Sequence, residues 1–223
     1  MTKPNREQDA INAYLNLMEK TGADSANLEI RKQFLQRLVA LIGGRPQDFG
    51  VYREAVDEAL EGLNKAEWPF YISVSREYYR FWIDDIKAIA ALHASGGYRA
   101  TPLVGSVPSE ELQVLWNNLD QQSFEVAEKW SLKAYNAALR QEGAEPAVVE
   151  TRTKLVKLLL VQLRETPERD GYYYQGAVDS LMPLFSMKET RELYIQVVRE
   201  FFYFWISDPE AVSRIVLHQP ADD

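Results

Sequence analysis

The sequence contains no cysteine and only two histidines, His93 and His218, among its 223 residues. The lack of cysteine excludes disulfide bonds, thiolate metal sites and cysteine nucleophiles. Neither histidine has the Glu-x-x-His spacing of carboxylate-bridged di-iron bundles or the His-Glu-x-x-His spacing of zinc proteases. We therefore expect no metal ion and no other cofactor.

Motifs for nucleotide binding and for nucleophilic catalysis are also missing. The sequence has no Walker motif, no Gly-x-Gly-x-x-Gly pattern after a strand and no nucleophile elbow. The glycine pairs Gly43-Gly44 and Gly96-Gly97 are typical of a helix end and of a linker. We predict no catalytic residue and favour a protein without catalytic activity, with a helical enzyme of unknown class as the least favoured interpretation.

Long apolar runs and an excess of positive charge are absent too. The most apolar run, residues 201–206, falls far short of the ~20 residues that a membrane span needs. A formal net charge of −8 and a pI near 5.0 disfavour binding to nucleic-acid phosphates and to anionic membranes. Residues 1–7 are polar and charged, unlike a secretory signal. We expect a cytoplasmic protein with no membrane span and no nucleic-acid partner.

Helical periodicity, by contrast, runs through almost the whole chain. Apolar residues recur three and four positions apart. Asn64 with Glu67, and Ser186 with Glu189, have the spacing of helix capping boxes. Only residues 172–174 have a strand-like composition, and this segment is too short to start a sheet. These patterns predict an all-α fold.

An aromatic stretch occurs twice, at residues 71–85 and 194–208. The similarity continues upstream at a nearly constant offset, which places Tyr14 on Tyr135 and Arg31 on Arg152. We therefore predict an internally duplicated helical bundle, with two copies of a roughly four-helix unit in a pseudo-twofold relation.

The predicted copies are residues 1–94 and 122–223, separated by residues 95–121. The glycines and prolines between Ser95 and Pro108 mark a linker, and a connecting helix is expected to begin near Ser109. We expect the copies to pack as one compact domain, and two separate small domains are the alternative.

The repeated stretch is apolar on nearly every side, which is typical of a buried central helix. Its aromatic side chains also suit a cavity for an apolar or aromatic small molecule between the two aromatic helices, or an oligomer face. The aromatic side chains that we name as candidates for these roles are Tyr52, Tyr78, Trp82, Tyr172, Tyr173, Tyr174 and Trp205.

An Arg-Glu pair recurs in the middle of each aromatic helix, as Arg76-Glu77 and Arg199-Glu200. An unpaired buried charge costs several kcal/mol, and adjacent helical residues point about 100° apart. We therefore expect Arg76 to bond with Glu200. By the same symmetry Arg199 would bond with Glu77. A solvent-facing strip of charge and a role in binding a polar ligand are the alternatives.

Taken together, these patterns favour a non-catalytic interaction, adaptor or regulatory protein that binds another protein or itself. In a homodimer, Tyr52 and residues 172–174 would be the anchor, because aromatic residues are enriched at interfaces. The alternative is a binder of an apolar or aromatic small molecule between the two aromatic helices.

Overall fold

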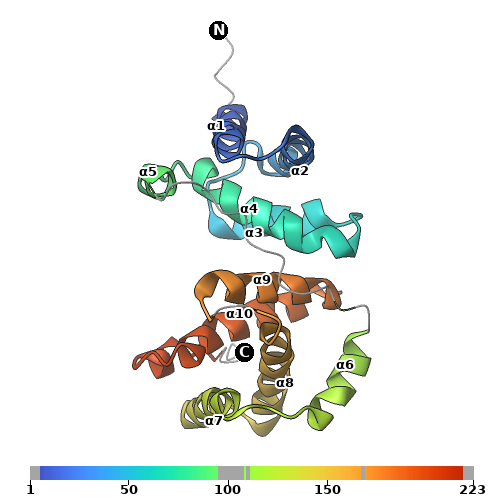
Figure 1. Ribbon diagram of the computed structural model, residues 1–223, viewed down its shortest axis with the longest axis vertical. Helices are drawn as coiled ribbons and strands as arrows, with labels where there is room; N and C mark the ends of the chain where they lie inside the picture. The colour runs from blue at the N-terminus through green and yellow to red at the C-terminus, as the bar shows by residue number, and fades with distance from the viewer. Residues whose placement is uncertain (1–5, 95–107, 109–110, 167–168, 218–223) are drawn as a thin grey trace, which may run out of the picture. The chain divides into compact units, whose positions relative to one another are not determined.

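The computed structural model of the chain describes residues 6–94, 108, 111–166 and 169–217 (Figure 1). Every regular element in these ranges is a helix, which confirms the all-α prediction. The chain divides into two compact units, Met1–Thr101 and Pro102–Asp223. Most of the predicted linker, residues 95–107, lies outside the described residues, as does His218. No helix in the described ranges is long and apolar enough to cross a bilayer.

The first unit is built around its fourth helix. Its elements, in chain order, are α1 (Arg6–Lys20), α2 (Ser25–Ile42), α3 (Phe49–Leu60), the 3₁₀ helix η1 (Lys65–Glu67), α4 (Trp68–Trp82) and α5 (Ile86–Ala94). α4 packs against α1, α2 and α3 (Figure 1). It therefore has protein on most sides, as expected for a helix that is apolar nearly all round.

Aspartate side chains cap the first turns of α2 and α3. Asp24 accepts a hydrogen bond from the Asn27 backbone N–H at 2.8 Å, and Asp48 accepts one from Gly50 at 2.8 Å. Each satisfies a donor that the first helical turn leaves free. Asn64 caps η1 rather than α4, and α4 then begins at Trp68 with Pro69 in its first turn, where a missing N–H costs nothing.

Among its described residues, the second unit contains a similar set of four long helices and four short helical segments. Its elements are α6 (Leu112–Asn118), η2 (Leu119–Gln121), α7 (Val126–Gln141), α8 (Pro146–Leu163), α9 (Gly171–Leu181), η3 (Met182–Leu184), α10 (Lys188–Trp205) and η4 (Ala211–Arg214). α10 packs against α7, α8 and α9, as α4 packs against α1, α2 and α3. α6 and η2 lie against α8.

One local prediction for this unit needs correction. The capping box of Ser186 with Glu189 is wrong, because the N-cap of α10 is Met187 and its side chain makes no capping hydrogen bond. Residues 172–174 are helical and form the first turn of α9, where the Asp170 carboxylate accepts from the Tyr173 N–H at 2.9 Å. This cap explains why a strand-like composition gives way to a helix.

Both aromatic helices end in the same way. Asp84 after α4 has φ 56° and Ser207 after α10 has φ 60°, so each chain leaves its helix through a left-handed residue that is not glycine. The Asp85 N–H then bonds to the Arg80 carbonyl at 3.0 Å, and the Asp208 N–H bonds to the Tyr203 carbonyl at 2.8 Å. These bonds satisfy carbonyls that the last helical turn leaves free.

Candidate functional site

Three buried residues of the first unit with polar groups form what we call the Arg31 cluster, made of Tyr14, Arg31 and Glu77. Arg31 Nη1 lies 2.5 Å from Glu77 Oε2. The Tyr14 hydroxyl donates to the same carboxylate oxygen at 2.5 Å and accepts a hydrogen bond from Arg31. Ser73 Oγ donates to Glu77 Oε1 at 3.1 Å. Both carboxylate oxygens of Glu77 are thus occupied by neighbours from α1, α2 and α4.

The Arg152 cluster, made of Tyr135, Arg152 and Glu200, repeats these contacts in the second unit. Arg152 Nη1 lies 2.5 Å from Glu200 Oε2, and the Tyr135 hydroxyl donates to that oxygen at 3.0 Å. Two further donors reach Glu200 Oε1, the Gln196 amide at 3.0 Å and the Val216 backbone N–H at 3.1 Å. The chain after α10 is therefore tied to this cluster.

The Nε donors of Arg31 and Arg152 differ in their hydrogen bonding. Arg31 Nε donates to Asn27 Oδ1 at 2.6 Å, from one turn earlier on α2. The residue one turn before Arg152 is Val148, which offers no side-chain acceptor. Within the described residues, the buried Nε of Arg152 has no hydrogen-bond partner. The second cluster therefore carries an unsatisfied donor that the first does not.

Burial controls the protonation of these groups. It raises the pKa of the Tyr14 hydroxyl well above 10.0, and the neighbouring Glu77 charge raises it further. Burial likewise raises the pKa of Tyr135, again with help from Glu200. Burial also raises the pKa of the Glu77 carboxyl above 4.5, although the Arg31 charge and three side-chain hydrogen bonds act against this. Both tyrosines therefore remain neutral hydrogen-bond donors.

The structure gives the two glutamates other partners than the ones we expected. Glu77 is paired with Arg31 on α2, and Glu200 with Arg152 on α8, instead of with Arg199 and Arg76. The physical reason is that each arginine comes from a neighbouring helix packed against the glutamate within the same unit. Arg76 is half-buried and Arg199 is exposed. The missed signal was a charged residue, Arg31 or Arg152, on the apolar face of a helix.

Most of the candidate aromatic residues form the cores of their units. Tyr52, Tyr78, Trp82, Tyr174 and Trp205 are buried. The Tyr52 ring lies 5.0 Å from the Trp82 ring, and the Tyr174 ring lies 5.0 Å from the Trp205 ring. The Tyr52 hydroxyl donates to the Ser75 carbonyl at 2.6 Å.

Two more of the buried tyrosines bond to backbone carbonyls, and the other two candidate tyrosines lie nearer the surface. The Tyr174 hydroxyl donates to the Val198 carbonyl at 2.6 Å, and the Tyr78 hydroxyl donates to the Glu7 carbonyl at 3.2 Å. Tyr172 and Tyr173 are half-buried and meet edge to face at 5.6 Å. Of the four tyrosines expected to anchor an interface, Tyr52 and Tyr174 are therefore inside their units.

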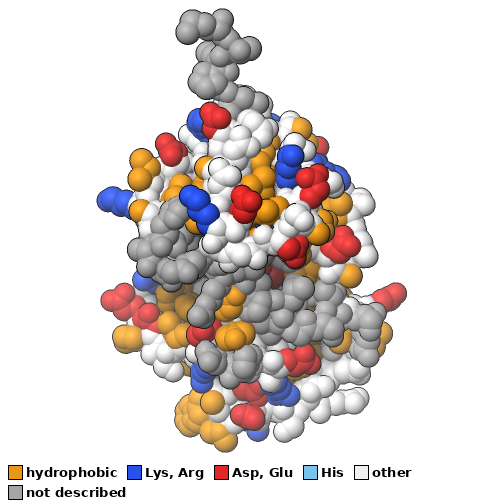
Figure 2. All heavy atoms as spheres, turned by 45° about the horizontal axis from the view of Figure 1, so that its top comes forward, with side chains coloured by type: hydrophobic (Ala, Val, Ile, Leu, Met, Phe, Trp, Pro, Cys, Tyr) orange, Lys and Arg blue, Asp and Glu red, His pale blue; other side chains and the backbone are white. Residues whose placement is uncertain are grey.

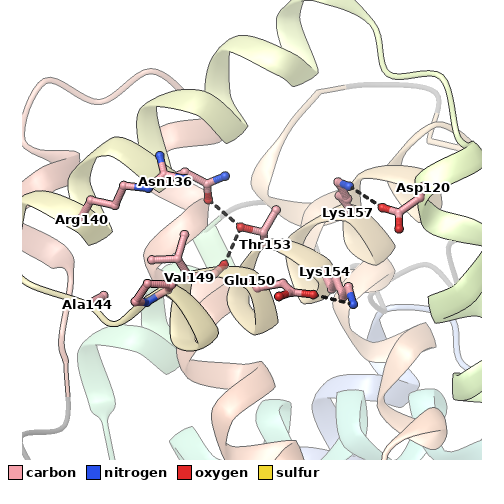
Figure 3. Close-up of a pocket in the computed structure, with 10 residues that line it drawn as sticks. Asp120, Asn136, Arg140, Ala144, Val149, Glu150, Thr153, Lys154 and Lys157 are labelled. Carbon is pink, nitrogen blue, oxygen red and sulfur yellow. Dashed lines mark hydrogen bonds and ion pairs between the residues drawn. The ribbon is translucent and has the colours of Figure 1, made fainter.

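A cleft of about 400 Å³ is found elsewhere in the second unit, between α7, α8 and η2 (Figure 3). Seven of its ten lining residues have charged or polar side chains, and they include Asp120, Arg140, Glu150, Lys154 and Lys157. Glu77, Glu200 and the candidate aromatic residues do not line it. This cleft therefore offers charged groups of both signs to a ligand.

An exposed apolar surface follows one side of α7. We call it the α7 surface, and it consists of Val126, Trp130, Ala134 and Ala137, spaced as one face of a helix requires. Val126 is 70% exposed and Trp130 is 66% exposed, with Lys133 Nζ 5.5 Å from the Trp130 ring centroid. Figure 2 shows hydrophobic side chains at the surface in several groups, one of them at the lower end of the view.

The chemistry that these sites allow is limited. The buried carboxylate of Glu200 accepts four hydrogen bonds from protein groups, and that of Glu77 accepts three. Within the described residues, no group of three or more histidine, aspartate or glutamate side chains is placed to hold a metal ion. Comparison with protein-family models, curated proteins and solved structures gives no match.

Proposed function

We propose that this chain is a non-catalytic interaction or adaptor protein, made of two copies of one four-helix unit, which binds another protein or itself. The observation that carries the proposal is the α7 surface, where Trp130 and Val126 stand in solvent. Exposed apolar patches around a large aromatic side chain are typical of protein-binding sites. The buried aromatic side chains, among them Trp82 and Trp205, pack inside their own units.

The matched contacts of the two units support the duplication. Tyr14, Arg31 and Glu77 in the first unit make the same bonds as Tyr135, Arg152 and Glu200 in the second. The two sets come from corresponding helices, and the two central helices end through the same left-handed turn. One ancestral unit that was copied accounts for both sets. The pseudo-twofold relation of the copies stays a prediction.

The α7 surface is a property of the second unit alone. Sliding the sequence on itself places Trp130 on Asp9 and Ala137 on Asn16, both exposed on α1. The position that corresponds to Trp130 in the first unit is therefore an acidic residue. Because α1 and α7 share three buried positions but differ where Trp130 is exposed, we attribute the difference to binding rather than to folding.

The partner that we propose first is a second copy of the chain. Trp130 is large, whereas Ala134 and Ala137 lie one and two turns further along the same face. Two antiparallel α7 helices would place each Trp130 over the small residues of the other copy. Small residues let helices approach to about 8 Å, at the close end of the usual range.

The mass of the protein in solution tests this proposal. Light scattering over a range of concentrations should give twice the chain mass of 25.6 kDa for the wild type. Trp130→Lys should return the mass to that of a monomer. Ile86→Lys is the matched control, because Ile86 is also exposed, at 71%, but lies in the first unit. A wild type that stays monomeric at every concentration would contradict self-association.

The alternative function, a binder of an apolar or aromatic small molecule between the two aromatic helices, also stays a prediction. It expects a chromophore or lipid to purify with the protein. Mass spectrometry of the native protein would detect either. A cytoplasmic location is likewise a prediction, and fractionation of the native cells would test it.

A further inference from the structure

The cleft between α7, α8 and η2 concentrates positive charge in a chain whose net charge is −8. Three cationic side chains line it, Arg140 from α7 and Lys154 and Lys157 from α8. Lys154 and Lys157 are three residues apart and share one face of their helix. Two carboxylates, Asp120 and Glu150, also line the cleft and leave a local excess of positive charge.

The two lysines of the cleft are less exposed than the carboxylates that neutralise them. Lys154 Nζ lies 2.9 Å from Glu150, and their side chains are 25% and 68% exposed. Lys157 Nζ lies 3.3 Å from Asp120, and their side chains are 21% and 75% exposed. Figure 3 shows both ion pairs as dashed lines. Exposed ion pairs of this kind contribute little to stability, so an incoming anion can replace the carboxylates at low cost.

Aromatic rings hold the two lysines in place. Lys154 Nζ lies 5.7 Å from the Trp116 ring centroid, and Lys157 Nζ lies 5.9 Å from that of Phe124. The segment that carries Trp116 and Asp120 packs against α8. The ammonium groups are therefore positioned before any ligand arrives, which reduces the entropy lost on binding.

Further hydrogen-bond donors are provided by α7. In the described part of the chain, Arg140 has no ion-pair partner, and its planar guanidinium can bind two oxygens of one anionic group. Asn136 Oδ1 lies 2.8 Å from the Thr153 hydroxyl, which leaves the Asn136 amide with two N–H donors. Arginine, lysine and amide donors together are suited to oxyanions.

We infer that this cleft binds a small organic anion with at least two negative charges, of the phosphorylated or polycarboxylate kind. The cleft volume of about 400 Å³ lies in the range of small-ligand sites. The ligand takes the places of Asp120 and Glu150 on the two lysines, and Arg140 binds its second charged group. This inference is independent of the proposed function, since the α7 surface does not line the cleft.

Calorimetric titration with pyrophosphate and citrate tests the inference, with sodium chloride at matched ionic strength as the blank. We expect at least one of the two anions to bind, and the one that binds identifies the phosphorylated or the polycarboxylate class. Lys154→Gln and Arg140→Gln should each weaken binding by about tenfold. Lys32→Gln removes the same charge from an exposed site in the first unit and should leave affinity unchanged.

The rim carboxylates give a second test with the opposite sign. Asp120→Asn and Glu150→Gln remove the groups that compete for the lysines, so each should tighten binding of the same anion several-fold. Absence of heat with both anions would overturn the inference, and so would equal weakening by Lys32→Gln and Lys154→Gln. Trp130→Lys should bind the anion as the wild type does, which separates this site from self-association.

Discussion

Arg31 and Glu77 meet at 2.5 Å with side chains that are only 4% and 2% exposed, and Tyr14 donates a hydrogen bond to the same carboxylate. A charge pair this deep is held together by its geometry, because each partner alone would be an uncompensated buried charge. The Arg31 cluster joins α1, α2 and α4 and therefore fixes how these helices pack.

Removal of one charge from the cluster should be far more damaging than removal of both. Arg31→Met or Glu77→Gln should each lower the free energy of unfolding by about 3–5 kcal/mol, since the remaining charge stays buried. The double variant Arg31→Met with Glu77→Leu should lose less than either single variant. Urea unfolding measures the three values. Arg45→Met, at an exposed site, should change stability little, and additive losses in the double variant would contradict the account.

The unsatisfied donor of Arg152 predicts a stabilising substitution. Val148→Asn places an acceptor one turn before Arg152, as Asn27 is placed before Arg31. We expect a gain of about 1 kcal/mol, the usual net value of one hydrogen bond. Thermal unfolding checks the result, with Val148→Leu as a control that adds no acceptor.

The reciprocal change, Asn27→Val, should destabilise the first unit by a similar or larger amount, because it leaves the buried Arg31 Nε without its acceptor. If Val148→Asn is no more stable than Val148→Leu, the unsatisfied Nε of Arg152 does not lower the stability of the protein.

Neighbouring tyrosines on α9 should respond differently to loss of the hydroxyl. Tyr174→Phe leaves the buried Val198 carbonyl without its 2.6 Å donor and should lower the free energy of unfolding by about 1–2 kcal/mol. Tyr173→Phe, at a half-buried site, should have little effect. Chemical denaturation of both variants makes the comparison. Equal losses would show that the hydrogen bond from Tyr174 to the Val198 carbonyl does not stabilise the fold.

The Glu128–Arg164 pair predicts a dependence of stability on pH. Burial alone would raise the pKa of Glu128, but hydrogen bonds from Arg164 and from the Glu125 N–H outweigh it and lower the pKa below 4.5. A pKa lowered by folding adds stability above the unfolded-state value, and this stability is lost as pH falls through the folded-state value. Because the pair is partly exposed, solvent screening limits the effect to about 1 kcal/mol.

Glu128→Gln should therefore be less stable than the wild type at neutral pH, and the difference should shrink as the pH is lowered below 4.5. Denaturant unfolding at a series of pH values provides the measurement. Glu19→Gln, at an exposed site, supplies the baseline. A difference in stability that grows toward acid pH would contradict a lowered pKa of Glu128.

The helices were predictable from sequence because their apolar periodicity is strong, and the two aromatic helices lie at the centres of their units as expected. Burial of Trp82 and Trp205 follows from the same pattern. The ion-pair partners were not predictable. Spacing along one helix shows that Glu77 needs a partner, but only the packing of α2 against α4 brings Arg31 to it.

The α7 surface and the cleft could not be predicted from the sequence for a different reason. Trp130 and Val126 look like any other members of an apolar helix until packing shows that α7 turns them to solvent. The cleft gathers Asp120, Arg140 and Lys157 from separate elements, so no local motif marks it. Both sites depend on which helix faces remain exposed after the helices pack, and a single sequence does not specify that packing.

The central claim is that the α7 surface binds a second copy of the chain, and the absence of cysteine permits a direct test of it. Ala134→Cys introduces a single thiol on this surface, and a short thiol-to-thiol cross-linker should join two copies into a covalent dimer. Ala13→Cys, at the corresponding exposed position on α1, should remain monomeric under the same treatment. No dimer from Ala134→Cys, or equal dimer from both variants, would contradict the claim.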